Sequence, residues 1–526
     1  MNEDIPASGS DPGSRYAGLE TWCLRHPPRQ LATLLEGDLS FSLWDSESKR
    51  LILSTDRFGL HPIYYCCSGS ELFVSWELED LLQHHPDSRV DMTSLSARVA
   101  GFLLPEGRTC YDGIRRVPAG MIVTVDEGGF RLKRHWSLEE VPELRLPDDG
   151  AYVEALGECL SSVHRDWLRV WPVPMGITLS GGLDSTSVAA ALRKIDSSRS
   201  IRAFSWVHPG LPEADESEGI GDACRALDLE LTRIEADRYW TLSDPRGLWT
   251  SRRGPEAHYY RESWEATFQT ATSQDYGYLL SGVGGDELFG GISSYPDLFL
   301  SGRWISLVRQ LNRERKEPGF GPRYFFRSML DPWLRNRFPA WERKRMRLPA
   351  WLTEATRQET HQLRLPPLPS RSGDFGRQVR IRFLQNLARN TQVLEVSRMA
   401  GCFGLKMIHP LLDRRLVEFA ASLPSSQNSN AGKDKMILRK TFRETLPAAI
   451  IQRRRKITVE SLFHRGFRER ETEKVWPLLR GMRSAELGLV DEPSLQDHYR
   501  QYLEGGGSGH GIWNAIVVED WLRRYF

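Results

Sequence analysis

The chain has 526 residues and a mass of 60.2 kDa, more than one hydrophobic core usually accommodates, so two domains are predicted. Its 70 Lys and Arg residues nearly balance 69 Asp and Glu residues, and the net charge of +1 argues against a protein dedicated to nucleic acids or anionic membranes. Seven cysteines show neither disulfide-framework density nor C-x-x-C spacing, and no apolar window is long enough to span a membrane, so we expect a cytoplasmic protein with reduced thiols.

Three hairpin patterns follow one another in the N-terminal part of the chain. Apolar and polar residues alternate around polar turns at residues 45–49, 68–70 and 127–129. Successive segments of period two predict an antiparallel, layered, β-rich domain. Prolines and acidic turn-forming residues interrupt the pattern at residues 142–150, so we expect one domain over residues 1–145 and a second over residues 151–526.

The second domain begins with alternating helical and strand patterns. Helices are predicted over residues 151–168, 186–195 and 218–229, and buried strands over residues 173–180 and 201–208. This alternation predicts right-handed βαβ units and a parallel sheet. The remainder of the chain is mainly helical in pattern, so the whole is an α/β protein with a helical C-terminal part.

The first motif is the loop S-G-G-L-D-S-T, which begins at Ser180 between a predicted strand and a predicted helix. Ligands of open parallel sheets bind beyond the carboxyl ends of the strands. Two glycines let backbone amides approach an anion, hydroxyl groups add donors, and the helix directs its positive end to the same point. Asp184 suits such a site only if a divalent cation separates it from the phosphates. A tight turn capped by serine is the alternative.

The second motif is the loop S-G-V-G-G-D-E-L-F-G-G, which begins at Ser281 after another predicted strand. Carboxylates from two strand ends, Asp184 and Asp286, are placed to hold Mg²⁺ on a triphosphate from both sides. An acidic helix N-cap at Asp286 is the alternative. The residues expected to bind the nucleotide are Ser180, Gly181, Gly182, Asp184, Ser185, Thr186, Ser281 and Gly282.

These motifs resemble those of the asparagine synthetase family. The first loop is similar to the pyrophosphate loop of ATP pyrophosphatases, and it is followed in order by the second loop, by H-P-L-L-D at residues 409–413 and by the basic stretch 432–456. Residues 37–65 resemble a class II glutamine amidotransferase domain, which has an αββα Ntn-type fold. The resemblance implies this domain followed by a parallel-sheet α/β ATP pyrophosphatase domain. It also implies ATP and Mg²⁺ as cofactors, with AMP and pyrophosphate as products.

The chain departs from the family at its acceptor side. Class II glutaminases use an N-terminal cysteine, whereas the first cysteine here is Cys23, so we expect no glutamine hydrolysis. Asparagine synthetases carry Glu, and β-lactam synthetases Tyr, at the position of Val283. The family's usual Glu and Arg before the P-x-L-D stretch are replaced by Lys406 and Ile408. A pocket for free aspartate is therefore not expected.

Among the family's branches, the chain looks most like the lasso peptide cyclases. That resemblance implies a precursor peptide as substrate, whose N-terminal amine attacks a side-chain carboxylate activated as an acyl adenylate. It also implies a leader-peptide protease or a leader-recognition protein as partner. The family's catalytic lysine matches Lys456, with Lys435 as the second candidate. A peptide needs space, so we expect a broad, partly apolar cavity beside Asp286, roofed by residues 425–435.

Three other interpretations stay open. An amide synthase acting on a small acid with ammonia would have a compact acceptor pocket. A pseudoenzyme that keeps the fold as a scaffold has no need of intact ATP loops. A tRNA-modifying pyrophosphatase would use the basic runs at residues 343–347 and 452–456, but it would leave the N-terminal domain unexplained.

Overall fold

The computed structural model describes most of the chain. The described residues are 39–85, 88–170, 174–248, 250–290, 294–315, 348–363, 375–387, 391–429, 433–453 and 457–526, with isolated positions between 321 and 338. Contacts divide the chain into two compact units, Met1–Ser94 with Leu104–Glu140, and Leu95–Leu103 with Val141–Phe526. The second unit therefore includes a short segment from within the N-terminal part of the chain.

Two antiparallel sheets make up the first unit, as the alternating sequence pattern predicted. One sheet has the order β1 (Phe41–Asp45), β2 (Arg50–Ser54), β6 (Met121–Asp126), β7 (Gly129–Arg134). The other has the order β4 (Glu71–Ser75), β3 (Tyr64–Ser68), β5 (Ile114–Arg116). The three predicted hairpins are confirmed as β1–β2, β3–β4 and β6–β7. Buried aliphatic side chains, among them Leu53, Ile63 and Val123, form the core of this unit.

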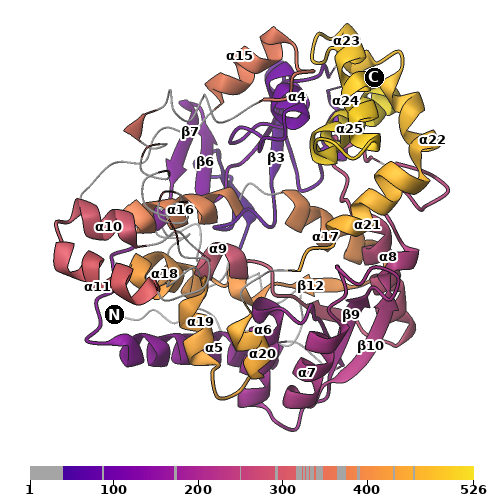
Figure 1. Cartoon of the computed structure of the whole chain (residues 1–526). Helices are drawn as coiled ribbons and strands as arrows, with labels where there is room; N and C mark the ends of the chain where they lie inside the picture. Colours follow the sequence, from indigo (N-terminus) through magenta and orange to yellow (C-terminus); the bar gives the residue numbers. More distant parts are fainter. Residues whose placement is uncertain are drawn as a thin grey trace. The chain divides into compact units, whose positions relative to one another are not determined.

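A five-stranded parallel sheet organises the second unit (Figure 1). Its order is β10 (Glu230–Glu235), β9 (Ile201–Val207), β8 (Met175–Thr178), β11 (Tyr278–Leu280), β12 (Lys406–Ile408). All four neighbouring pairs are parallel, so the carboxyl ends of the strands meet at one edge. This arrangement confirms the predicted parallel α/β sheet.

Helices pack against the sheet and connect its strands. The helix α5 (Asp149–Val170) precedes the first strand of the sheet, and α6 (Leu183–Ile195), α7 (Ser217–Leu227) and α8 (Arg261–Ser273) lie between successive strands. On one face, α8 and α17 (Thr391–Cys402) share a buried core with the strands, in which Phe204, Phe268 and Leu279 are central. The burial of these side chains fixes the strand ends that carry the two loops.

The remainder of the second unit is helical, as predicted. Its helices are α9 (Gly285–Phe289), α10 (Tyr295–Leu300), α11 (Trp304–Glu314), α15 (Glu354–Gln362), α16 (Phe375–Leu387), α18 (Arg414–Ser422), α19 (Met436–Thr441), α20 (Ala448–Gln452), α21 (Glu460–His464), α22 (Thr472–Val475), α23 (Arg483–Glu486), α24 (Glu492–Leu503) and α25 (Gly509–Tyr525). Two further helices, α3 (Leu78–Leu82) and α4 (Met92–Val99), lie earlier in the chain. Side-chain caps begin α18, α24 and α25 at Asp413, Asp491 and Ser508. In the described part of the chain, none of the helices combines the length and the apolarity that crossing a bilayer requires.

Candidate functional site

The first loop joins the end of β8 to the start of α6. Gly181 has a φ of +68°, and an added Cβ would lie 2.9 Å from the backbone nitrogen of Ile220, so this position needs glycine. The loop is held by a contact of 3.2 Å between the hydroxyl oxygens of Ser180 and Ser185. The Thr186 hydroxyl instead donates to the carbonyl oxygen of Gly182, at 2.6 Å, and closes the first turn of α6.

The second loop follows β11 and packs directly on the first. A Cβ added to Gly282 would lie 2.5 Å from the backbone nitrogen of Ser185, and one added to Gly285 would collide with the carboxyl group of Asp184. Glycine at both positions therefore permits the two loops to touch. The structure brings together all the residues that the sequence analysis assigned to nucleotide binding, at the carboxyl edge of β8 and β11.

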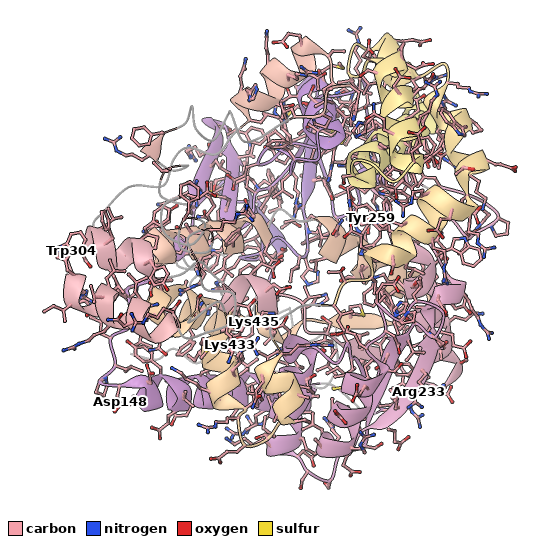
Figure 2. All side chains as sticks on the ribbon, in the orientation of Figure 1. Asp148, Arg233, Tyr259, Trp304, Lys433 and Lys435 are labelled. Atoms are coloured by element: carbon pink, nitrogen blue, oxygen red, sulfur yellow. The ribbon has the colours of Figure 1, made fainter. Side chains whose placement is uncertain are left out.

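A lysine ammonium lies between the two predicted metal ligands. Lys435 Nζ is 2.5 Å from Asp184 Oδ2 and 2.6 Å from Asp286 Oδ1. Lys435, labelled in Figure 2, is buried and has a φ of +55° at the residue preceding α19. Burial disfavours its charge, but the two carboxylates outweigh burial and raise the pKa of Lys435. The site thus holds one positive charge between two negative charges.

The same pair of carboxylates fits a divalent cation. Carboxylate oxygens are the ligands that Mg²⁺ prefers, and it commonly takes one or two of them together with phosphate oxygens and water. Among the described residues, no group of three or more His, Cys, Asp or Glu side chains is arranged to hold a metal. Asp184 and Asp286 would therefore hold Mg²⁺ jointly with a nucleotide, where the ion neutralises charge on the phosphates.

Replacing Lys435 with Met is expected to make the thermal stability of the protein depend on Mg²⁺. The variant keeps two adjacent carboxylates without the ammonium that now separates them, so they repel each other until a cation binds. Thermal unfolding should show a lower Tm than wild type in EDTA and a partial recovery with millimolar Mg²⁺. K⁺ at equal ionic strength serves as the control, and equal Mg²⁺ responses of variant and wild type would contradict the assignment.

His409 is a site residue that the sequence analysis quoted but assigned no role. It follows β12, and its Nδ1 lies 2.7 Å from the hydroxyl of Ser281, while Nε2 lies 3.1 Å from the hydroxyl of Ser397. The imidazole thus connects the second loop to α17. The position of His409 at the carboxyl end of a strand was the available signal, but a three-residue strand is not recognisable from sequence.

Replacing His409 with Gln is expected to flatten the acid dependence of stability. Burial lowers the pKa of His409 to about 4, from 6.5. Between these values the unfolded chain binds one more proton at this residue than the folded chain, so the free energy of unfolding falls as the pH decreases from 6.5 to about 4. The variant should lose less stability over that window, by about 1.4 kcal/mol per pH unit, in urea unfolding monitored by circular dichroism. An unchanged slope would contradict a neutral imidazole.

A partly apolar cavity lies beside Asp286, as the sequence analysis expected, but it is compact rather than broad. We call it the inner cavity; its volume is about 240 Å³. Its lining residues are His258, Trp264, Gly282, Val283, Gly284, Gly285, Asp286, Glu287, Leu387, Gln392, Val393, Val396, Met407 and His409. Most of these side chains are apolar, so the cavity suits a hydrophobic part of an acceptor next to the carboxylate of Asp286.

The expected roof over this cavity is not seen in the described part of residues 425–435. None of these residues lines the inner cavity. Ser425, Gln427 and Asn428 are buried instead, and the Asn428 amide donates to the carbonyl oxygens of Leu288 and Gly290. These bonds hold the start of the segment against the end of α9. Lys435, at the other end of the segment, contacts Asp184 and Asp286.

The alternation along β12 and the residue after it determines which side chains line the inner cavity. Met407 and His409 line the inner cavity, whereas Lys406 is exposed and Ile408 is buried elsewhere. Lys406 and Ile408, which replace the family's usual Glu and Arg, therefore do not line this cavity. Val283, the third substitution, does line it.

Lys456 and the basic run 343–347 lie outside the described residues, as does Cys23. Arg453 belongs to the same basic run as Lys456 and is described. Its guanidinium donates to the carbonyl oxygen of Gly181, at 3.4 Å, and pairs with Glu216 at 2.6 Å. The Arg453 side chain thus connects the start of the basic run 452–456 to the first loop.

Comparisons with known proteins match both parts of the chain. The profile of the Asparagine synthase family matches residues 167–523, which is more than half of the chain. The profile of the Glutamine amidotransferase domain matches residues 24–136. Both loops, Lys435 and His409 fall within the first match.

Individual relatives are distant. The chain is 24% identical to glutamine-hydrolyzing asparagine synthetase 1 of Bacillus subtilis over 279 residues, which cover 52% of this chain and 42% of that protein. It is 24% identical to glutamine-hydrolyzing asparagine synthetase 3 of the same organism over 454 residues, 80% of this chain and 67% of that protein. A shorter match, 30% identical over 161 residues, covers 30% of this chain and 23% of the amidase chyE of Penicillium rubens. The match to asparagine synthetase 1 thus covers less than half of that protein's length.

Proposed function

Since this chain belongs to the asparagine synthase family, we propose that it is an ATP-dependent, amide-forming ligase. In this proposal a carboxylate of the acceptor attacks the α-phosphate of ATP, pyrophosphate leaves, and the resulting acyl adenylate is attacked by an amine with release of AMP. The observation that carries the proposal is the contact between the two loops, with Asp184 and Asp286 both paired to the Lys435 ammonium.

The first loop supports the cleavage of ATP between its α- and β-phosphates. The backbone of Gly181 and Gly182 and the N-terminus of α6 offer N–H groups to the departing pyrophosphate. Asp184 and Asp286 would hold Mg²⁺, whose charge would stabilise the departing pyrophosphate. The α-phosphate would then face the inner cavity, because that cavity opens beside Asp286.

We further propose that the amine and the activated carboxylate belong to one molecule, a peptide, as in lasso peptide cyclization. Val283 at the cavity wall has no group that transfers a proton, and the apolar lining offers little to the charged groups of free aspartate. A tethered amine does not need tight binding of its own, because tethering supplies a high effective concentration. A precursor peptide is then the substrate, and a leader-peptide protease or a leader-recognition protein is the partner that supplies it.

The test uses purified full-length protein with ATP, Mg²⁺, ¹⁵N-labelled ammonium and short peptides encoded beside its gene. Mass spectrometry should show a product that has lost one water and carries no ¹⁵N. Label in the product would favour the second candidate, an amide synthase that joins ammonia to a small acid. That candidate rests on the similarity to glutamine-hydrolyzing asparagine synthetases.

A further inference from the structure

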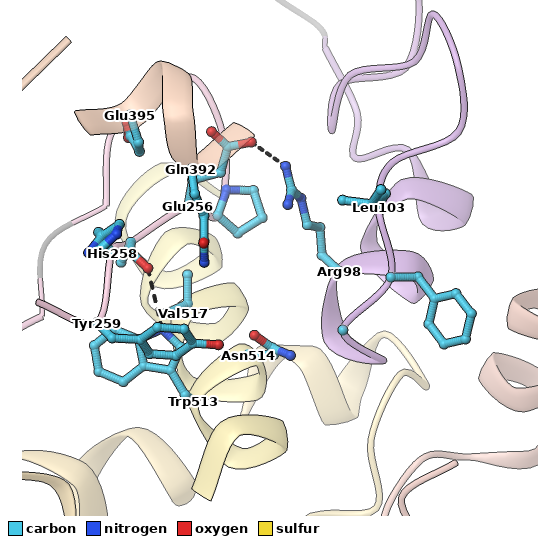
Figure 3. Close-up of a pocket in the computed structure, with 14 residues that line it drawn as sticks. Arg98, Leu103, Glu256, His258, Tyr259, Gln392, Glu395, Trp513, Asn514 and Val517 are labelled. Carbon is cyan, nitrogen blue, oxygen red and sulfur yellow. Dashed lines mark hydrogen bonds and ion pairs between the residues drawn. The ribbon is translucent and has the colours of Figure 1, made fainter. Parts of the chain in front are cut away.

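A second cavity lies within the second unit, beside the inner cavity. We call it the outer cavity; its volume is about 260 Å³. The two cavities share His258 and Gln392 as lining residues, so they adjoin at these side chains. The remaining lining comes from the segment Arg98–Leu103, from the loop before α8, from α17 and from α25 (Figure 3).

The charged side chains around the outer cavity balance one another. Arg98 forms an ion pair with Glu256, drawn as a dashed line in Figure 3. Three arginines act through their charges on the remaining carboxylate of the lining, that of Glu395, and favour its charged form: Arg253, Arg261 and Arg398. Since neither sign of charge is in excess, the cavity suits an uncharged polar group better than an ammonium or a carboxylate.

The imidazole of His258, which lines both cavities, offers one hydrogen-bond donor. The backbone N–H of Tyr260 donates to Nδ1 of His258 at 3.1 Å, so Nδ1 carries no proton. Burial lowers the pKa of His258 to about 4, so the ring is neutral near neutral pH. The single proton of a neutral imidazole must then be on Nε2.

This donor has no acceptor within the part of the chain that the structure describes. The contact with Tyr260 uses Nδ1, and Nε2 of His258 forms no hydrogen bond with any described residue. The ring lies edge to face with those of Tyr260 and Trp264, with centroids 6.0 Å and 6.4 Å apart, and these contacts restrict its rotation. The Nε2–H group is therefore available to a ligand that enters the two cavities.

We propose that Nε2–H of His258 donates a hydrogen bond to a main-chain carbonyl oxygen of a peptide acceptor where the two cavities adjoin. The inference rests on the proposed function and names a substrate-binding residue for it. The inner cavity beside Asp286 would take the side chain of the reacting residue, whose main chain would then reach His258. A main-chain carbonyl is uncharged and only accepts hydrogen bonds, so it matches a neutral donor in a charge-balanced wall. The contact uses neither the amine nor the activated carboxyl group, so both remain free to react with each other.

The most direct test observes the imidazole by NMR in the full-length protein, without ATP. Histidine is labelled with ¹⁵N in the ring, and His258 is assigned by the loss of its signals in His258→Gln. The ring should be the Nε2–H tautomer, and N-acetylaspartate N-methylamide, which has two amide carbonyls, should shift its Nε2 resonance. Propionate keeps the carboxylate but lacks the main chain, and it should cause no shift. An Nδ1–H tautomer, or no shift with the amide probe at millimolar concentrations, would overturn the proposal.

Variants separate hydrogen bonding from a structural role. His409 lines the inner cavity, so its ring resonances report binding of the same amide probe when His258 is replaced. His258→Leu should weaken binding about 10-fold, whereas His258→Gln, whose amide group keeps a donor, should stay within about 3-fold of wild type. His61→Leu, at an exposed position of the first unit, is the matched control.

Equal binding by His258→Leu and wild type, or equal losses in His258→Leu and His258→Gln, would overturn the proposal. Neither measurement depends on catalysis. A ligase that forms AMP but shows no effect of the amide probe on His258 fails only here. A protein that shows the effect but forms no AMP fails only the proposed function.

Discussion

Replacing Asp184 or Asp286 with Asn is expected to lower the rate of ATP-dependent pyrophosphate release by about 10³-fold, equivalent to about 4 kcal/mol of barrier. Each change removes one of the two negative charges that now surround the Lys435 ammonium and that would hold a cation on the phosphates. Asn keeps the size of the side chain, so the close packing of the first loop against Gly285 is preserved. Pyrophosphate and AMP are measured by coupled assay and by chromatography with the peptide substrate present.

Asp497→Asn, on the exposed face of α24, serves as the control for this prediction because it removes a carboxylate far from the loops in sequence. The double variant at both site positions should be little slower than either single variant, since the two carboxylates act on the same ion. Wild-type rates in either single variant would remove the proposed role of that carboxylate. ADP as the sole nucleotide product of the wild-type protein would contradict the proposed chemistry as a whole.

Replacing Lys456 with Met is expected to lower turnover by about 10²-fold, with little change in the affinity for ATP. A compact ammonium near the adenylate stabilises an oxyanion that appears only in the transition state, so its loss acts on kcat rather than on ground-state binding. Arg453, three residues earlier in the sequence, contacts the carbonyl oxygen of Gly181 in the first loop. Single-turnover kinetics and calorimetric titration with ATP measure the two quantities separately.

Lys194→Met, at an exposed position of α6, is the matched control for this substitution. Unchanged turnover in Lys456→Met would move the catalytic role to Lys435, the lysine found between Asp184 and Asp286. Lys435→Met is expected to alter the Mg²⁺ response of the free protein whichever lysine is catalytic, whereas Lys456→Met is not. That response therefore distinguishes a lysine that occupies the cation position from one that acts only on the reacting group.

The sequence was sufficient to predict those helices and strands whose buried residues recur with a regular period. The hairpins of the first unit and the strands β8 and β9 follow from alternation or from continuous apolar runs, because those residues face a core. Two edge strands of the parallel sheet were not predicted. In β10 only Ile234 is buried, and β12 has three residues, so neither leaves a recognisable pattern.

The site residues likewise divide into those that a local sequence pattern identifies and those that it does not. Asp184 and Asp286 were identifiable because each follows a glycine loop at a strand end, and parallel strands bring such loops to one edge. The position of Lys435 between them and the connection of Ser281 to Ser397 through His409 both depend on residues distant in sequence. Such juxtapositions are set by packing, and no local pattern reports them.

The most direct test of carboxylate activation follows an oxygen atom. The peptide substrate is prepared with ¹⁸O in the carboxylate that forms the amide, and AMP is recovered after incubation with the protein, ATP and Mg²⁺. If the carboxylate attacks the α-phosphate and an amine then attacks the carbonyl carbon, one ¹⁸O remains on the phosphate of AMP for each amide formed. AMP without ¹⁸O, or ¹⁸O recovered in inorganic phosphate, would contradict an acyl adenylate.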